Sequence, residues 1–205
     1  MMTLRRIMEF GRRLWHGEDV IFIRQDKRRW NEQFAYGRWD YLLLGHPNMT
    51  LLAGLLSQQA AQSGTRLRVL DIGCGNGALA VSISKMQDMI GYHGIDISED
   101  ALKQARILVP GASFSVEDAE HPSATLGTFD VLIFSEVVYY MAPSMLDSYR
   151  TYAHGHTIIL VSVVRSWRSF FIWRRIHRQI EINKSFVVSD KKTGHTFDIV
   201  VGHFV

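Results

Sequence analysis

The stretch Val69-Leu-Asp-Ile-Gly-Cys-Gly-Asn-Gly77 decides the fold. It begins as a short apolar strand and ends in three glycines at alternate positions, directly before a helical pattern that starts at Ala78. Glycines let the backbone turn sharply and let a ligand approach the amides of the loop. The helix that follows offers unpaired N–H groups and the positive end of its dipole. The stretch therefore predicts a site for a phosphate, a carboxylate or a nucleoside edge; a tight turn without a ligand is the alternative.

Strand and helix patterns alternate on both sides of this loop. Strands are expected over residues 68–72, 93–97, 112–116, 129–134 and 157–164. Helices are expected over residues 78–86, 101–108 and 143–152. Apolar strands separated by helices indicate a parallel sheet that is covered on both faces. The last strands, 185–189 and 196–205, are joined by 190–194, which is too short for a crossover helix, so we expect the sheet to finish with an antiparallel pair.

The length and composition bound the class of protein. The chain has 205 residues, of which 47% are hydrophobic and 21% charged. This is enough for one sizeable core, too short for two full α/β domains, and too apolar for a disordered chain. We expect a single domain over residues 1–205. Within it, residues 1–45 form an N-terminal helical lid and residues 66–205 form the ligand-binding core.

The sequence also favours a cytoplasmic protein. Its most apolar run, 158–164, is far shorter than the roughly 18 residues that a spanning helix needs. Arg5, Arg6 and Glu9 interrupt the N-terminus before an apolar block can form, so no secretory signal is predicted. Cys74 is the only cysteine, which excludes disulfides within the chain and cysteine-rich metal sites.

The net charge of +3 conceals an uneven distribution. Residues 41–164 hold six Lys and Arg against eleven Asp and Glu. Residues 1–40 hold nine against six, and residues 165–192 hold eight against two. The basic flanks indicate either an anionic partner or simply two solvated faces.

Three aspartates are placed at the ends of successive predicted strands: Asp71, Asp96 and Asp118. The carboxyl ends of parallel strands are where ligands bind in open α/β sheets. Asp96 is placed to accept hydrogen bonds from two ribose hydroxyls, and Asp118 to accept one from an adenine amino group. Asp71 would repel a pyrophosphate and suits a ligand with ammonium or hydroxyl donors.

The glycines alone do not choose the ligand. Gly73, Gly75 and Ala78 also fit the dinucleotide-binding fingerprint, and Asp96 has a counterpart in NAD sites. No Gly-Lys-Ser/Thr follows the loop, so a triphosphate-binding loop is excluded. Asp71 argues against a nicotinamide oxidoreductase.

Four stretches together resemble the class I S-adenosylmethionine-dependent methyltransferases: 69–77, 94–98, 117–119 and 129–141. The resemblance spans roughly residues 66–164, about half of the chain. It implies a Rossmann-like α/β fold with helices on both faces of a seven-stranded, mostly parallel sheet. The implied strand order is 3-2-1-4-5-7-6, with strand 7 antiparallel.

The resemblance also implies the cofactor, S-adenosyl-L-methionine, and the residues around it. These are Asp71, Gly73, Cys74, Gly75, Asn76, Gly77, Asp96, Ile97, Asp118, Ala119 and Ser135. The glycine loop would face the methionine portion, with Asp71 near its ammonium. Asp96 would hold the ribose, with Ile97 against the adenine and Asp118 and Ala119 at its edge.

Glu136 and Tyr139 are the catalytic candidates, because this family places its acceptor after strand four. Glu136 would orient or deprotonate a hydroxyl or an amine, and Tyr139 would bond the acceptor. Alternatively, Tyr139 and Tyr140 pack under the next helix, and Glu136 is a solvated or capping residue. Ser-Glu-Val-Val-Tyr-Tyr, residues 135–140, resembles small-molecule enzymes, including sugar-amine N-methyltransferases. It lacks the Asn/Asp-Pro-Pro-Tyr/Phe pattern of nucleic-acid base methylation. No spacing of His, Asp or Glu predicts a metal.

The aromatic segment 30–41 resembles the part of small-molecule methyltransferases that closes over the cofactor. Its expected contacts to the acceptor are Tyr36, Arg38 and Trp39, together with Tyr140 from the core. The alternative is that these aromatic side chains only dock the N-terminal helix on the sheet.

The segment 165–180 combines five arginines with several aromatic residues. One face must pack on the sheet as an ordinary core helix. The remaining aromatic and basic residues allow contact with an anionic membrane surface or with RNA. The chain is too short, however, to include a separate RNA-binding module.

The sequence therefore predicts a methyltransferase that transfers a methyl group to O or N of a small-molecule acceptor, such as a sugar-containing or other biosynthetic intermediate. Two alternatives remain open. One is an RNA or lipid methyltransferase that uses the basic flanks. The other is a non-catalytic nucleoside-binding module on the same fold. The oligomeric state is not predicted.

Overall fold

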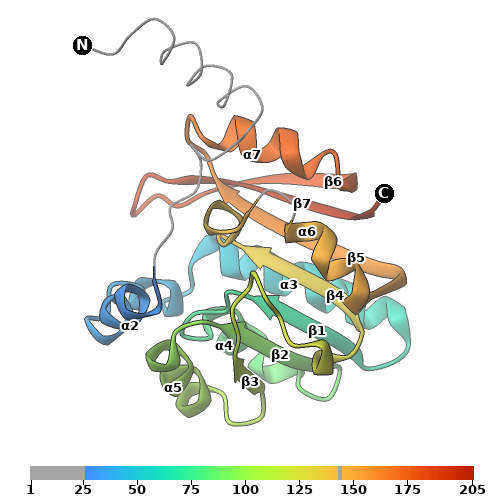
Figure 1. Cartoon of the computed structure of the whole chain (residues 1–205). Coiled ribbons are helices and arrows are strands. Elements are labelled where there is room, and N and C mark those ends of the chain that lie inside the picture. The colour runs from blue at the N-terminus through green and yellow to red at the C-terminus, as the bar shows by residue number, and fades with distance from the viewer. Residues whose placement is uncertain (1–25, 143–144) are drawn as a thin grey trace, which may run out of the picture.

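A seven-stranded sheet forms the centre of the computed structural model, which describes residues 26–142 and 145–205 (Figure 1). The strands are β1 Leu67–Ile72, β2 Ile90–Asp96, β3 Ser113–Val116, β4 Phe129–Ser135, β5 Ala153–Val164, β6 Ile180–Ser189 and β7 Thr196–Phe204. Their order is β3-β2-β1-β4-β5-β7-β6. β7 runs antiparallel to β5 and β6, whereas the other neighbouring pairs are parallel. The predicted fold class and strand order are confirmed.

Helices cover both faces of the sheet (Figure 1). On one face, α3 Pro47–Ser63 and α4 Ala78–Ser82 pack on Val69 of β1. On the other, α6 Met145–Ser148, the 3-10 turn η5 Tyr149–Tyr152 and α7 Ser169–Ile176 pack on Leu70 and Ile72. These three β1 residues are fully buried, as expected for a parallel strand covered on both sides.

Several element boundaries differ from the sequence-based expectations. The helix predicted over 78–86 is α4 followed by a 3-10 turn, η2 Ser84–Met86, and the hydroxyl of Ser82 donates back to the carbonyl of Ala78 at 3.0 Å. The helix predicted over 143–152 is divided between α6 and η5, apart from residues 143 and 144, which lie outside the described residues.

The C-terminal boundaries also move. β5 begins four residues earlier than predicted, because Ala153 already pairs with Phe129 of β4, ahead of a register shift in the ladder. β6 begins at Ile180 rather than 185, because the long strand β7 pairs with it as far as Phe204. The core helix expected within the segment 165–180 is therefore only α7, eight residues long.

The described part of the predicted lid lies at the carboxyl end of the sheet. There α2 Lys27–Ala35 packs beside α5 Glu99–Leu108 (Figure 1). Asp26 caps α2 by accepting the backbone N–H of Arg29 at 2.9 Å. Asn31 accepts the hydroxyl of Ser98 at 2.8 Å, and this bond ties α2 to the N-terminus of α5. The first 25 residues of the predicted lid lie outside the described residues.

Within the described residues, no helix is both long and apolar enough to cross a membrane. The cytoplasmic location stays a prediction. So does the division into one domain with a lid over residues 1–45.

Candidate active site

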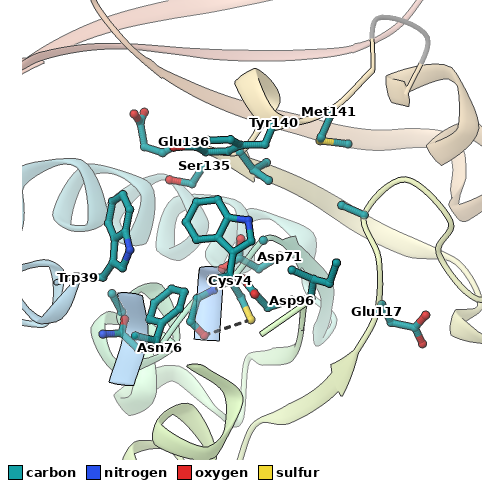
Figure 2. A pocket seen from close by; sticks show the side chains of 18 of the residues that line it. Trp39, Asp71, Cys74, Asn76, Asp96, Glu117, Ser135, Glu136, Tyr140 and Met141 are labelled. Atoms are coloured by element: carbon teal, nitrogen blue, oxygen red, sulfur yellow. Dashed lines mark hydrogen bonds between the residues drawn. The ribbon is translucent and has the colours of Figure 1, made fainter. Parts of the chain in front are cut away.

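A cavity of about 540 Å³ opens at the carboxyl ends of β1, β2 and β4 (Figure 2). The glycine loop and the strand-end carboxyl groups form one part of its wall. The rest comes from the lid, including Trp39, and from the loop after β4, including Tyr140 and Met141. The volume lies within the range of small-molecule sites. The site therefore has the location that the sequence predicted.

The glycine loop is tightly enclosed on two sides. Gly73 and Gly75 adopt positive φ angles of 70° and 56°, which side chains disfavour. A Cβ atom on Gly73 would lie 2.5 Å from Cγ2 of Val137, and one on Gly75 would lie 3.0 Å from Cζ of Phe34. Glycine is therefore required both for the turn and for the approach of the β4 loop and the lid. Gly77, which precedes α4, does not line the cavity.

Asp96 connects the glycine loop to the turn after β2. Its carboxylate accepts the backbone N–H of Gly75 at 2.9 Å and that of Ser98 at 2.8 Å. Burial raises the pKa of Asp96, while these bonds oppose the shift. Each carboxylate oxygen retains a further lone pair, so the group can also accept the two hydroxyls of a ribose.

Asp71 lies deeper, with only 2% of its surface exposed. One oxygen accepts the hydroxyl of Tyr92 at 2.5 Å, and the other, Oδ1, is buried and accepts no hydrogen bond among the described residues. Burial raises the pKa of Asp71 to about 7. A buried acceptor without a donor, on the wall of a cavity, fits the ammonium group of S-adenosylmethionine. The residues present therefore fit this cofactor.

Other predicted cofactor residues also line the cavity: Cys74, Asn76, Ile97, Asp118, Ala119 and Ser135. The amide of Asn76 donates to Asp40 at 3.4 Å and links the glycine loop to the lid. Asp118 accepts the N–H of Glu120 at 2.8 Å, and the hydroxyl of Tyr149 donates to the carbonyl of Ala119 at 3.0 Å. The loop after β3 is thereby held beside the cavity; the adenine contact of Asp118 stays a prediction.

Glu136 has a left-handed backbone conformation, and both oxygens of its carboxylate accept hydrogen bonds. Among the described residues it is the only one other than glycine with a positive φ, 57°. The hydroxyl of Ser162 donates to its Oε1 at 2.7 Å, and the N–H of Val164 donates to its Oε2 at 3.1 Å. Burial raises its pKa, and the hydrogen bonds to the carboxylate oppose the shift. Glu136 lines the cavity, but its carboxylate is bound to β5.

Tyr139 has a different place from the predicted one. Its side chain is buried and does not line the cavity. Its hydroxyl donates to Glu136 and accepts the N–H of Val164 at 3.0 Å. The prediction that Tyr139 bonds an acceptor is therefore corrected: the hydroxyl supports Glu136 from below the cavity.

Sequence reasoning missed Asn48, a fully buried residue in the first turn of α3. Its amide donates to the hydroxyl of Ser135 at 3.4 Å, and its carbonyl oxygen lies 3.1 Å from the hydroxyl of Ser162, sharing that single proton with Glu136. Asn48 thereby joins the ends of β4 and β5 beneath the cavity. The only signal in the sequence was an asparagine directly after Pro47. That pair is equally typical of an ordinary helix start.

The lid contributes different residues from those predicted. Trp39 lines the cavity, whereas Tyr36, 79% exposed, and Arg38 do not. These two predicted acceptor contacts are therefore corrected, because neither side chain belongs to the cavity wall. The wall contains Trp30 instead, whose ring meets that of Tyr140 edge to face at 4.9 Å between centroids.

Within residues 26–142 and 145–205, no group of three His, Cys, Asp or Glu side chains is arranged to hold a metal ion. Independence of metal stays a prediction.

The sheet order, the glycine loop after β1 and the carboxylates at the ends of β1 and β2 define a class I S-adenosylmethionine-dependent methyltransferase. Residues 63–199 match the family model described as methyltransferase domain, and the chain belongs to this family.

Known proteins of similar sequence and structure agree with this class. A trans-aconitate 2-methyltransferase of Afipia carboxidovorans is 31% identical over 109 residues, 53% of this chain and 40% of that protein. The chain thus spans less than half the length of this relative. The magnesium protoporphyrin IX methyltransferase of Synechocystis, solved with bound S-adenosylhomocysteine, has a TM-score of 0.64 at 16% identity and covers 87% of this chain and 99% of that one. The N-methyltransferase NodS of Bradyrhizobium japonicum has a TM-score of 0.63 at 15% identity, covering 78% and 89%.

Proposed function

We propose that this protein methylates an O or N atom of a small-molecule acceptor that binds between the lid and the loop after β4. The observation that carries the proposal is the wall of the cavity. It continues from the cofactor residues to Trp30 and Tyr140, whose rings meet across the lid and the core. A space closed by two aromatic side chains suits a small molecule better than a nucleic-acid strand.

Each part of the wall has a role in this proposal. S-adenosylmethionine supplies a methyl group already activated on a sulfonium. Asp96 holds the ribose, and the buried Oδ1 of Asp71 accepts the ammonium. Trp30 and Tyr140 exclude water and align the acceptor with the methyl group. Glu136 fixes the backbone between β4 and β5 and contributes negative charge beside the acceptor.

The relative from Afipia is named for trans-aconitate, an acceptor that carries carboxylates. Two observations argue against the same acceptor here. Arg38, the one basic residue among the predicted acceptor contacts, lies outside the wall. Within the described residues, moreover, no Lys or Arg lines the cavity.

The test is transfer of labelled methyl groups from S-adenosylmethionine to three separate preparations: a small-metabolite extract, total RNA and anionic lipid vesicles. We expect label in the metabolite fraction with the wild-type protein and its loss with Asp96→Ala. Label in RNA or lipid would favour the alternatives that use the basic flanks. Cofactor binding without transfer to any fraction would favour a non-catalytic module.

A further inference from the structure

The ionisable side chains of the cavity wall are almost all acidic. Seven carboxyl groups line it, and no Lys or Arg does so within the described residues; His121 is the single imidazole among them. Asp71, Asp96 and Asp118 are accounted for by the cofactor. The cofactor does not account for the other four carboxyl groups, which belong to Asp26, Glu117, Glu120 and Glu136.

Two of these four lie next to the aromatic pair. Asp26 is one helical turn before Trp30, and the N–H of Trp30 donates to its carbonyl at 3.2 Å. Glu120 accepts the N–H of Ala142, two residues after Tyr140, at 2.8 Å. The two carboxyl groups therefore line the cavity from the segment that carries Trp30 and from a loop bonded to the segment that carries Tyr140, and these two rings meet at 4.9 Å.

Within the described part of the chain, one arginine acts on the aromatic pair without belonging to the cavity wall. Arg168 acts electrostatically on Tyr140, but it does not line the cavity, and its guanidinium stacks on Trp167 at 5.2 Å. A wall of aromatic rings and carboxylates attracts cations, because ring faces and carboxylates both carry negative potential. The same wall repels a carboxylate or a phosphate.

From this combination we infer that the acceptor is an amine, held in its cationic form by Trp30, Tyr140 and the carboxyl groups of Asp26 and Glu120. The inference rests on the proposed function and names the chemical class of its acceptor. The methylated product, also a cation, would be held by the same groups.

The reaction balances without a further reactant. The ammonium form of the acceptor first gives up one proton to solvent. The lone pair of the amine then forms the N–C bond while the C–S bond breaks, and the electron pair of the broken bond stays on sulfur. The products are the methylated ammonium ion and neutral S-adenosylhomocysteine, and one proton is released in total.

The experiment measures binding, independently of turnover. Protein saturated with S-adenosylhomocysteine is titrated calorimetrically with benzyltrimethylammonium and with phenylacetate, a cation and an anion of similar size. We expect the cation to bind at least about tenfold more tightly. Trp30→Leu should weaken binding of the cation by about three- to tenfold, and Trp30→Phe should retain most of the affinity for it. Glu120→Gln should reduce the preference for the cation.

Trp167→Leu is the matched control, since this indole is 62% exposed and lies outside the cavity wall. Equal binding of both probes, tighter binding of phenylacetate, or no binding of either would overturn the inference. So would an unchanged preference in Trp30→Leu. If instead S-adenosylhomocysteine fails to bind the folded wild-type protein, the proposed function fails first, and the two failures are thereby distinguished.

Discussion

The carboxylate of Asp71 accepts the hydroxyl of Tyr92 at 2.5 Å, and both side chains are buried beside the cofactor cavity. This bond satisfies one carboxylate oxygen and leaves Oδ1 without a donor among the described residues. Burial raises the pKa of Asp71 to about 7 in the cofactor-free protein. An ammonium placed at Oδ1 would favour the ionised form, so cofactor binding and proton release are linked.

The first prediction is that affinity for S-adenosylhomocysteine increases between about pH 6 and pH 8, the window around the raised pKa of Asp71. Below that pKa the protonated Asp71 must release a proton on binding, so affinity falls by up to about tenfold per pH unit. Calorimetry in two buffers of different ionisation enthalpy measures both affinity and protons released. Asp71→Asn should bind more weakly at high pH and show a flatter profile. An equally steep profile in this variant would assign the proton to another group.

The second prediction concerns stability without cofactor. The folded pKa of Asp71, about 7, is above its unfolded value of 3.8, so the folded state holds the proton more tightly. The stability from this group is full below the unfolded pKa and is lost as pH rises through the folded one. The shift from 3.8 to about 7 corresponds to on the order of 4 kcal/mol. Urea unfolding measures the free energy of unfolding at about pH 5 and pH 8. Between these two pH values, Asp71→Asn should lose less of this free energy than the wild type does.

The third prediction compares two glycines. Gly73→Ala places a Cβ 2.5 Å from Val137 at a φ of 70°, so we expect about 2 to 4 kcal/mol of destabilisation and lost cofactor binding. Gly54→Ala is the matched control in α3, with nothing within 4 Å of the new Cβ. It should stabilise the protein by about 0.5 to 1 kcal/mol. Unfolding curves of both variants decide the matter; a tolerated Gly73→Ala would refute the proposed close approach of the β4 loop.

The fourth prediction is that Glu136→Gln lowers kcat and leaves cofactor affinity within about twofold of wild type. The amide has one acceptor oxygen where the carboxylate has two, so it cannot accept from both Ser162 and Val164, and the link to β5 weakens while the glycine loop stays intact. Ser162→Ala removes another bond to the same carboxylate and should give a smaller effect in the same direction. Turnover of Glu136→Gln at the wild-type rate would remove this residue from the mechanism.

Much of the fold could be predicted from sequence because buried parallel strands leave a strong local signal. The apolar run of β1 followed by alternate glycines indicated both the start of the sheet and the position of the cavity. Boundaries were less predictable where long-range pairing decided them. Ile180 reads as part of a helical face, yet it pairs with Phe204 at the far end of β7.

The cofactor side of the cavity could be predicted for a similar local reason: its residues follow strand ends in the chain. The acceptor side could not, because it joins distant segments. Trp30 meets Tyr140 only after α2 is docked on α5. Tyr139 and Tyr140 are adjacent in sequence but point to different places in a 3-10 turn, which no periodic pattern reveals.

The central claim, that the strand-end carboxylates hold S-adenosylmethionine, is tested most directly by calorimetric titration of S-adenosylhomocysteine. The wild-type protein should bind one molecule per chain and bind NAD poorly. Asp96→Ala should weaken binding by about 10- to 100-fold, the loss of about 1.5 to 3 kcal/mol typical of hydrogen bonds to a charged group. Asp147→Ala, at an exposed carboxylate on α6, should leave it unchanged. No binding by the folded wild-type protein, or unchanged affinity in Asp96→Ala, would contradict the claim.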